Sequence, residues 1–167
     1  MDVARRRLVA GAGVAALVPR SALSSPGGFR LGVTDWNLGK SGKVEAVALA
    51  RRLGFDGVEV SLGNQPVNER LPLDQAEIQD QYLRAAKEHG IAIAGTCLDI
   101  LHRNYLKNDK LGRKWVADGI PITKKLDAKV MLLPFFGKGE LATRAEMDSV
   151  GDLLRELAPE AAQAGVT

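Results

Sequence analysis

One kind of junction recurs along the chain at a nearly constant interval. At each junction a helical pattern ends and a short apolar run begins. The junctions lie at Gly54, Gly90, Asp127 and Gly165, spaced 36, 37 and 38 residues apart. Glycine is common just past a helix end, because it adopts left-handed backbone angles without a steric penalty. A period that holds one apolar run and one helical pattern predicts repeated βα units and a parallel sheet.

Helix and strand signals between the junctions agree with such units. Thr143 and Glu146 form a capping box for the last expected helix, and Asp74 with Glu77 predicts the same cap for the second. An Ala- and Val-rich segment at about 43–53 predicts the first helix. The apolar runs that we expect to be strands are residues 29–34, 57–61, 91–96 and 130–133.

The first 24 residues have the pattern of an export signal. Arg5, Arg6 and Arg7 precede an apolar, small-residue run at 8–18, and small residues follow at 21–24. This arrangement is typical of a twin-arginine signal peptide, and the apolar run is shorter than the roughly 20 residues that span a bilayer. We therefore predict a signal at residues 1–24 and a periplasmic or extracellular protein that is not membrane-bound after the signal is removed. A disordered basic N-terminus is the alternative.

The basic balance of the chain comes from this leader. The whole chain carries 23 Lys and Arg against 20 Asp and Glu, whereas residues 25–167 carry 19 of each. A domain with no net charge lacks the basic surface typical of nucleic-acid binding, so we expect no nucleic-acid partner. The single cysteine, Cys97, is expected to be a small apolar residue of the third strand.

Three segments, residues 31–38, 54–60 and 130–137, resemble the xylose isomerase-like TIM-barrel superfamily of sugar phosphate isomerases and epimerases. The resemblance covers residues 29–167 and is most specific at Gly-Phe-Asp-Gly-Val-Glu, residues 54–59. A complete (β/α)8 barrel takes about 250 residues, whereas residues 29–167 number 139. We therefore expect an α/β fold with the first four βα units of such a barrel, truncated before a fifth strand that Val166 would begin.

The resemblance also implies a function for the full-length protein. Members move a proton between neighbouring carbons through an enediolate, with a divalent metal (Mn, Mg, Co or Zn) as Lewis acid. In the family, two glutamates, an aspartate and a histidine from strands five to eight bind the metal, and the glutamates are the acid/base pair. None of these positions can be matched here. We therefore predict no catalytic residues and no metal ligands in this chain, no metal bound by it, and no activity of the chain alone.

Five residues near the expected carboxyl ends of strands are candidates for substrate binding, because barrel active sites lie at that face. Glu59 interrupts an otherwise apolar strand, and a buried charge needs a partner or a function. Trp36 could wall a sugar pocket, Asp99 and His102 follow the third strand, and Lys138 could reach a phosphate or carboxylate. Each has a structural alternative: a satisfied buried carboxylate, a rim aromatic, a solvated loop residue or a surface lysine.

Two other functions remain open for this sequence. The protein could be a noncatalytic exported carbohydrate-binding barrel, or a truncated gene product without activity. One branch of the superfamily is a DNA-repair endonuclease with histidines on strands two and three, but Glu59 stands at the second strand instead. The expected partner is therefore a sugar or sugar phosphate. Unpaired strand edges leave association into a homo-oligomer open as well.

Overall fold

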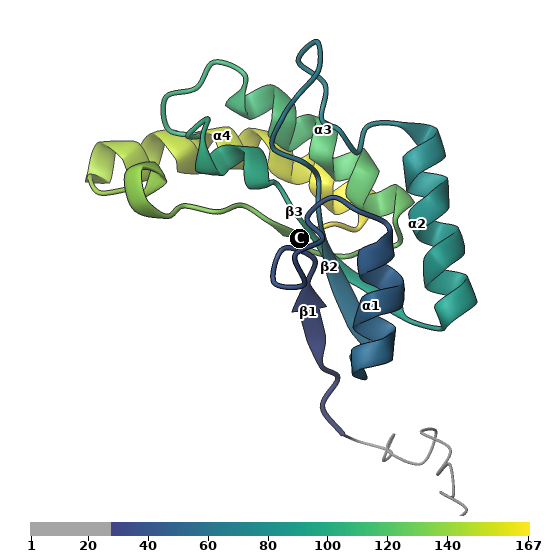
Figure 1. Cartoon of the computed structure of the whole chain (residues 1–167). Coiled ribbons are helices and arrows are strands. Elements are labelled where there is room, and N and C mark those ends of the chain that lie inside the picture. Colours follow the sequence, from purple (N-terminus) through teal and green to yellow (C-terminus); the bar gives the residue numbers. More distant parts are fainter. Residues whose placement is uncertain (1–27) are drawn as a thin grey trace, which may run out of the picture.

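Four βα units follow one another along the chain and share one parallel sheet (Figure 1). The structure is a computed structural model, and it describes residues 28–167. The predicted signal peptide, residues 1–24, lies outside these residues and stays a prediction. The sheet has the order β1-β2-β3-β4 and confirms the predicted fold of four βα units. Its strands are β1 (Gly32–Thr34), β2 (Gly57–Ser61), β3 (Ala92–Cys97) and β4 (Met131–Leu132).

The two outer strands are shorter than the apolar runs that predicted them. The run at 29–34 forms strand only from Gly32, and Phe29 and Leu31 are 98% and 60% exposed. β1 pairs with a single neighbour, β2, through residues 32–34. Leu31 is still hydrogen-bonded to the start of β2, since its carbonyl accepts the Asp56 N–H at 2.8 Å and the Gly57 N–H at 3.3 Å. Residues 28–31 are exposed, however, so their apolar side chains gain no burial from a longer strand.

Four helices connect and follow the strands. Three of them end at a left-handed glycine, with φ of 92° at Gly54, 60° at Gly90 and 72° at Gly165. At the fourth junction Asp127 adopts the same region, with φ of 58°. The recurring junction is therefore a left-handed turn at every unit. The helices are α1 (Glu45–Leu53), α2 (Ala76–His89), α3 (Gly112–Lys125) and α4 (Arg144–Ala164), with short 3-10 turns η2 (Asp99–His102) and η3 (Gly137–Gly139).

One of the two predicted helix caps is present and the other is wrong. At α4, Thr143 accepts a hydrogen bond from the Glu146 N–H, and the Glu146 carboxylate accepts one from the Thr143 N–H. At α2 the N-cap residue is Gln75, without a side-chain cap. The Asp74 carboxylate instead accepts a hydrogen bond from Arg70 at 2.9 Å. Arg70, four residues earlier, thus binds the carboxylate that was predicted to cap the helix.

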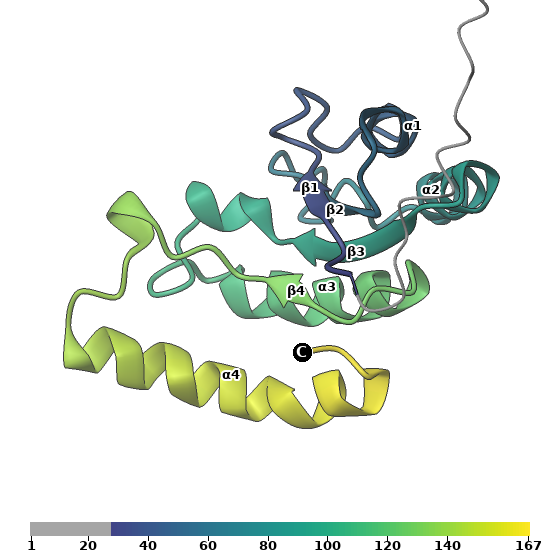
Figure 2. The same cartoon turned by 90° about the horizontal axis from the view of Figure 1, so that it is seen from below.

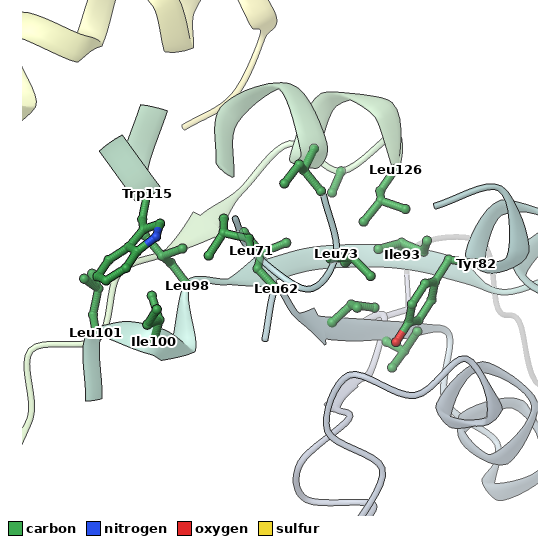
Figure 3. Close-up of a cluster of buried hydrophobic side chains, with 14 of the residues drawn as sticks. Leu62, Leu71, Leu73, Tyr82, Ile93, Leu98, Ile100, Leu101, Trp115 and Leu126 are labelled. Carbon is green, nitrogen blue, oxygen red and sulfur yellow. The ribbon is translucent and has the colours of Figure 1, made fainter. Parts of the chain in front are cut away.

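The core lies between the helices and one face of the sheet. Val58, Val60 and Leu62 are fully buried there, and successive residues of a strand face opposite sides. Figure 3 shows Trp115 next to Leu98 at one end of a buried cluster and Tyr82 at the other. Cys97 is 1% exposed and lies in β3 as predicted, and burial, the largest cause, together with nearby carboxylates raises the pKa of its thiol to about 12.

The last two residues of the chain continue the sheet beyond β4. The Thr167 N–H donates to the Lys129 carbonyl at 2.8 Å, and the Met131 N–H donates to the Thr167 carbonyl at 2.9 Å. This alternation is the pattern of a parallel neighbour, and it agrees with the expectation that Val166 begins a fifth strand. Figure 2 shows the C-terminus between α4 and β4. Within residues 28–167, none of the helices is long and apolar enough to cross a bilayer.

Tyr82 gives a test of this core. Its side chain is 0% exposed and its hydroxyl has no hydrogen-bond partner in the described structure, which costs about 1–3 kcal/mol of desolvation. We expect Tyr82→Phe to leave the free energy of unfolding unchanged or to raise it by about 1 kcal/mol, measured by urea denaturation. Tyr105→Phe, at a half-buried position, is the control. A loss above about 1 kcal/mol in Tyr82→Phe would show that the hydroxyl is satisfied.

Candidate functional site

The five predicted site residues lie near the carboxyl ends of the strands. Trp36 is in the loop after β1, Glu59 is the third residue of β2, Asp99 and His102 belong to η2 after β3, and Lys138 lies in η3 after β4. Because the carboxyl ends of parallel strands meet at one edge of the sheet, these elements share the face where barrel enzymes bind their substrates. No measurement tests the roles of the five residues, and their assignment to substrate binding stays a prediction.

Glu59 lies on the face of β2 that turns away from the helices. Its neighbours Val58 and Val60 are buried in the helix-side core. The Glu59 side chain is half-buried, and its Oε1 atom is buried without a hydrogen-bond partner in the described structure. Burial and, to a smaller extent, the charge of Asp35 raise the pKa of Glu59. Glu59 therefore carries an unused acceptor at the candidate site.

A register irregularity in the sheet accompanies Glu59. Val58 pairs with Ile93, but Glu59 pairs with Gly95, so β3 has one extra residue, Ala94, at this point. Such bulges often lie next to functional sites, because they change the direction of a side chain. A Cβ on Gly95 would lie 3.3 Å from the Val130 carbonyl and 3.8 Å from Glu59 Cγ. Glycine at position 95 thus lets the Val130 backbone, just before β4, approach β3 closely, whereas the distance to Glu59 would be an ordinary van der Waals contact.

Asp35 lies next to the candidate residues, and the sequence analysis missed it. It directly follows β1, is 0% exposed, and accepts hydrogen bonds from the Ser61 N–H at 2.9 Å and the Ser61 hydroxyl at 2.7 Å. Burial raises the pKa of Asp35, although its hydrogen bonds act in the opposite direction. One signal could have pointed to it: Asp35 is the acidic residue between the first expected strand and Trp36, in a segment that resembled the family.

Asp99, which follows β3, is hydrogen-bonded to the segment that follows β2. It is 6% exposed, and its Oδ1 atom accepts a hydrogen bond from the Gly63 N–H at 2.9 Å. Burial raises the pKa of Asp99 to about 6, against the effect of its hydrogen bonds. Between the two carboxylates, the Leu62 N–H donates to the Cys97 carbonyl at 2.9 Å. The residues that end β2 are therefore held from the β1 side by Asp35 and from the β3 side by Asp99.

His102 and Lys138 belong to the exposed rim. The His102 ring stacks on Phe136, with centroids 6.0 Å apart and an interplanar angle of 18°. Phe136 is 67% exposed and lies two residues before Lys138, which is exposed as well. The stack therefore joins the loop after β3 to the loop after β4 and brings His102 and Lys138 to one part of the rim.

The described residues do not fit a metal ion. Among residues 28–167, no three His, Cys, Asp or Glu side chains come together in an arrangement that could hold one. Asp35 and Asp99 also use carboxylate oxygens to accept backbone N–H groups. We derive no chemical step through a metal from these residues. An apolar cavity of about 200 Å³ between α3, α4 and β4 contains none of the five candidates in its lining.

Comparisons with known proteins agree with the fold. The family model described as "Xylose isomerase-like TIM barrel" matches residues 47–167. A D-psicose 3-epimerase solved with D-fructose has a TM-score of 0.62 at 14% identity, and the match covers 83% of this chain and 50% of that one. For D-psicose 3-epimerase with D-tagatose from Clostridium cellulolyticum H10, these values are 0.61, 15%, 83% and 50%.

A sugar phosphate isomerase/epimerase from Parabacteroides distasonis ATCC 8503 is similar as well, with a TM-score of 0.59 at 14% identity. That match covers 86% of this chain and 51% of the other. At such identities the similarity shows the fold alone. The chain spans about half the length of the solved structures that it matches. None of the curated proteins matches it.

Proposed function

The chain belongs to the xylose isomerase-like TIM-barrel family, and from this premise we propose that the whole protein is a sugar or sugar phosphate isomerase or epimerase. In this proposal, residues 28–167 form part of the substrate-binding side. The observation that carries it is the unpartnered Glu59 Oε1 atom, which lies near the strand ends where barrel substrates bind. A buried carboxylate oxygen without a donor is unfavourable, and a sugar hydroxyl is a suitable donor.

The other candidates would complete the contact with a sugar. Trp36 is 37% exposed in the loop beside β2, and an exposed indole offers an apolar face and an N–H donor to a sugar ring. Lys138 and His102 on the rim would contact a part of the substrate farther from Glu59, such as a phosphate. Moving a proton between two carbons needs an acid/base pair and stabilisation of an oxyanion, and we assign neither to residues 28–167.

Glu59→Gln tests the proposed binding role. We expect the wild-type chain to bind D-fructose or D-tagatose, the sugars named for the similar epimerases, in isothermal titration. Replacing the carboxylate by a neutral amide of the same size weakens one charged hydrogen bond, so the affinity should fall about tenfold or more. Glu88→Gln, at an exposed site on α2, should bind as the wild type does. Equal affinity in Glu59→Gln would remove Glu59 from the site.

A noncatalytic carbohydrate-binding barrel is the second candidate. The same contacts support it, because the unpartnered Glu59 oxygen and the exposed Trp36 indole would bind a sugar whether or not the protein is an enzyme. The two functions differ in one measurement on the whole protein. An isomerase or epimerase supplied with Mn²⁺ in D₂O should place deuterium on a carbon of the sugar, which proton NMR detects. Sugar binding without this exchange would favour the binding barrel, and no sugar binding would contradict both.

A further inference from the structure

We propose that Asp35 is a positioning residue of the sugar site, whose carboxylate fixes the loop that carries Trp36 against the end of β2. The relation of this loop to a sugar rests on the proposed function above, whereas the fixation itself is a property of this chain. The loop runs from Asp35 to Gly42, between β1 and α1.

A single carboxylate joins both ends of this loop to the neighbouring strand. Asp35 Oδ2 accepts hydrogen bonds from the Gly42 N–H at 2.8 Å and from the Ser61 N–H at 2.9 Å. Asp35 Oδ1 accepts one from the Ser61 hydroxyl at 2.7 Å. Because that hydroxyl proton is used on Asp35, the Ser41 hydroxyl, 3.0 Å from Ser61 Oγ, is the donor in the second contact. Ser41, Ser61 and Asp35 thus form one directed chain of hydrogen bonds.

Backbone hydrogen bonds fold the loop tightly around Asp35. The Lys40 N–H donates to the Asp35 carbonyl at 2.8 Å, and the Gly39 N–H donates to the Trp36 carbonyl at 3.0 Å. The Asp35 N–H itself donates to the Glu59 carbonyl at 3.0 Å. The loop is therefore joined to β2 at Glu59 by the backbone of Asp35 and at Ser61 by its side chain. Glu59 and Trp36, the two proposed sugar contacts, are held through the same residue.

The choice of a carboxylate at this place argues for positioning. Taking a charge out of water is costly, and buried charges with good partners often contribute little net stability compared with apolar side chains. What a buried acceptor with several donors does provide is one defined geometry. Here that geometry orients a loop whose Trp36 side chain is 37% exposed, in reach of solvent and of a ligand.

Asp35→Ala is the variant that tests fixation of the loop. The chain has two tryptophans, so in a Trp115→Phe background the fluorescence reports on Trp36 alone. We expect Asp35→Ala to shift this emission to longer wavelength and to increase its quenching by acrylamide. Amide hydrogen exchange at Ser61 and Gly42 should become about tenfold faster or more, because both N–H groups lose their acceptor. Where Trp115→Phe does not fold, the NMR signal of the Trp36 indole N–H in the otherwise unchanged chain gives the same readout.

Asp99→Ala is the matched control, since it removes a buried carboxylate from the other side of β2. It should speed exchange at Gly63 while leaving the Trp36 emission and the exchange of Ser61 unchanged. Asp35→Asn, which keeps one oxygen acceptor, should fall between the wild type and Asp35→Ala. If Trp36 emission and Ser61 exchange do not change in folded Asp35→Ala, the proposed fixation is wrong.

Sugar titration separates this proposal from the proposed function. If the wild-type chain binds D-fructose or D-tagatose, folded Asp35→Ala should bind the same sugar at least about tenfold more weakly. A tenfold loss of affinity corresponds to about 1.4 kcal/mol. Unchanged affinity with a released Trp36 loop would overturn the positioning role and leave the sugar function intact. A wild-type chain that binds no sugar would refute the sugar function and with it the role of Asp35 in the sugar site, while the fluorescence and exchange results would still decide whether Asp35 fixes the loop.

Discussion

Trp115→Ala is expected to lower the free energy of unfolding by about 3–5 kcal/mol, the usual cost of truncating a buried tryptophan. Trp115 is 1% exposed and packs in the core from α3. Its Nε1–H also donates to the Glu69 carbonyl at 3.1 Å. Glu69 lies in the loop between β2 and α2 and has a φ of 60°. The variant therefore creates a cavity and also removes the hydrogen bond that holds the loop between β2 and α2 at Glu69.

Urea denaturation followed by far-ultraviolet circular dichroism measures this effect without relying on tryptophan emission. Trp36→Ala is the matched control, since Trp36 is 37% exposed and its replacement should cost less than about 1 kcal/mol. A comparable loss in the two variants would contradict the placement of Trp115 in the core. A loss below about 2 kcal/mol in Trp115→Ala would mean that the surroundings collapse into the cavity.

Asp99 is expected to contribute stability that increases as the pH falls from about 7 to about 4. Burial raises the pKa of Asp99 from 3.8 to about 6 in the folded chain, so between these values the folded state binds more protons than the unfolded state. The stability that Asp99 contributes is then fully present below pH 3.8 and is lost as the pH rises through about 6. A shift of this size corresponds to about 3 kcal/mol.

Denaturation midpoints at several pH values test this prediction by comparison with Asp99→Asn. The variant keeps an oxygen that can accept the Gly63 N–H but does not titrate, so its stability should depend less on pH than that of the wild type. Asp152→Asn, on the exposed surface of α4, is the control for removal of a carboxylate. Burial raises the pKa values of Asp35 and Glu59 as well, and their contributions have the same sign as that of Asp99. The hydrogen bond with Lys107 lowers the pKa of Glu146, and its contribution has the opposite sign. These three carboxylates are the same in the wild type and both variants, so the comparison isolates Asp99. Parallel pH profiles for wild type and Asp99→Asn would contradict the prediction.

Local patterns predicted the architecture well, because they depend on residues close in sequence. The left-handed glycines at Gly54, Gly90 and Gly165 need only the missing Cβ atom, and the capping box of Thr143 and Glu146 needs only the first turn of its own helix. The predicted cap at Asp74 failed for a related reason. The Arg70 guanidinium is an equally local partner for that carboxylate, and sequence spacing alone does not decide between two local partners.

The candidate site was predicted less completely than the fold. The five candidates were chosen from their positions after or within expected strands, and the structure places them near the carboxyl ends of those strands. What the sequence did not reveal was which carboxylates are already occupied. Asp99 binds Gly63, which is 36 residues away, whereas Glu59 retains an unpartnered oxygen. From the sequence alone both residues were acidic candidates, and nothing in the sequence showed which of them keeps an unpartnered oxygen.

The sequence by itself thus determined the repeating βα unit, the number of units and the face of the sheet on which the site residues lie. The helix ends, the strand alternation and the order of the units follow from interactions within about one unit of the chain. Only the tertiary structure placed Asp35 next to the candidate residues, because its partner Ser61 is 26 residues away on the neighbouring strand. Such a contact exists only after β1 and β2 have paired, and burial by the paired strands is also what raises the pKa values of the site carboxylates.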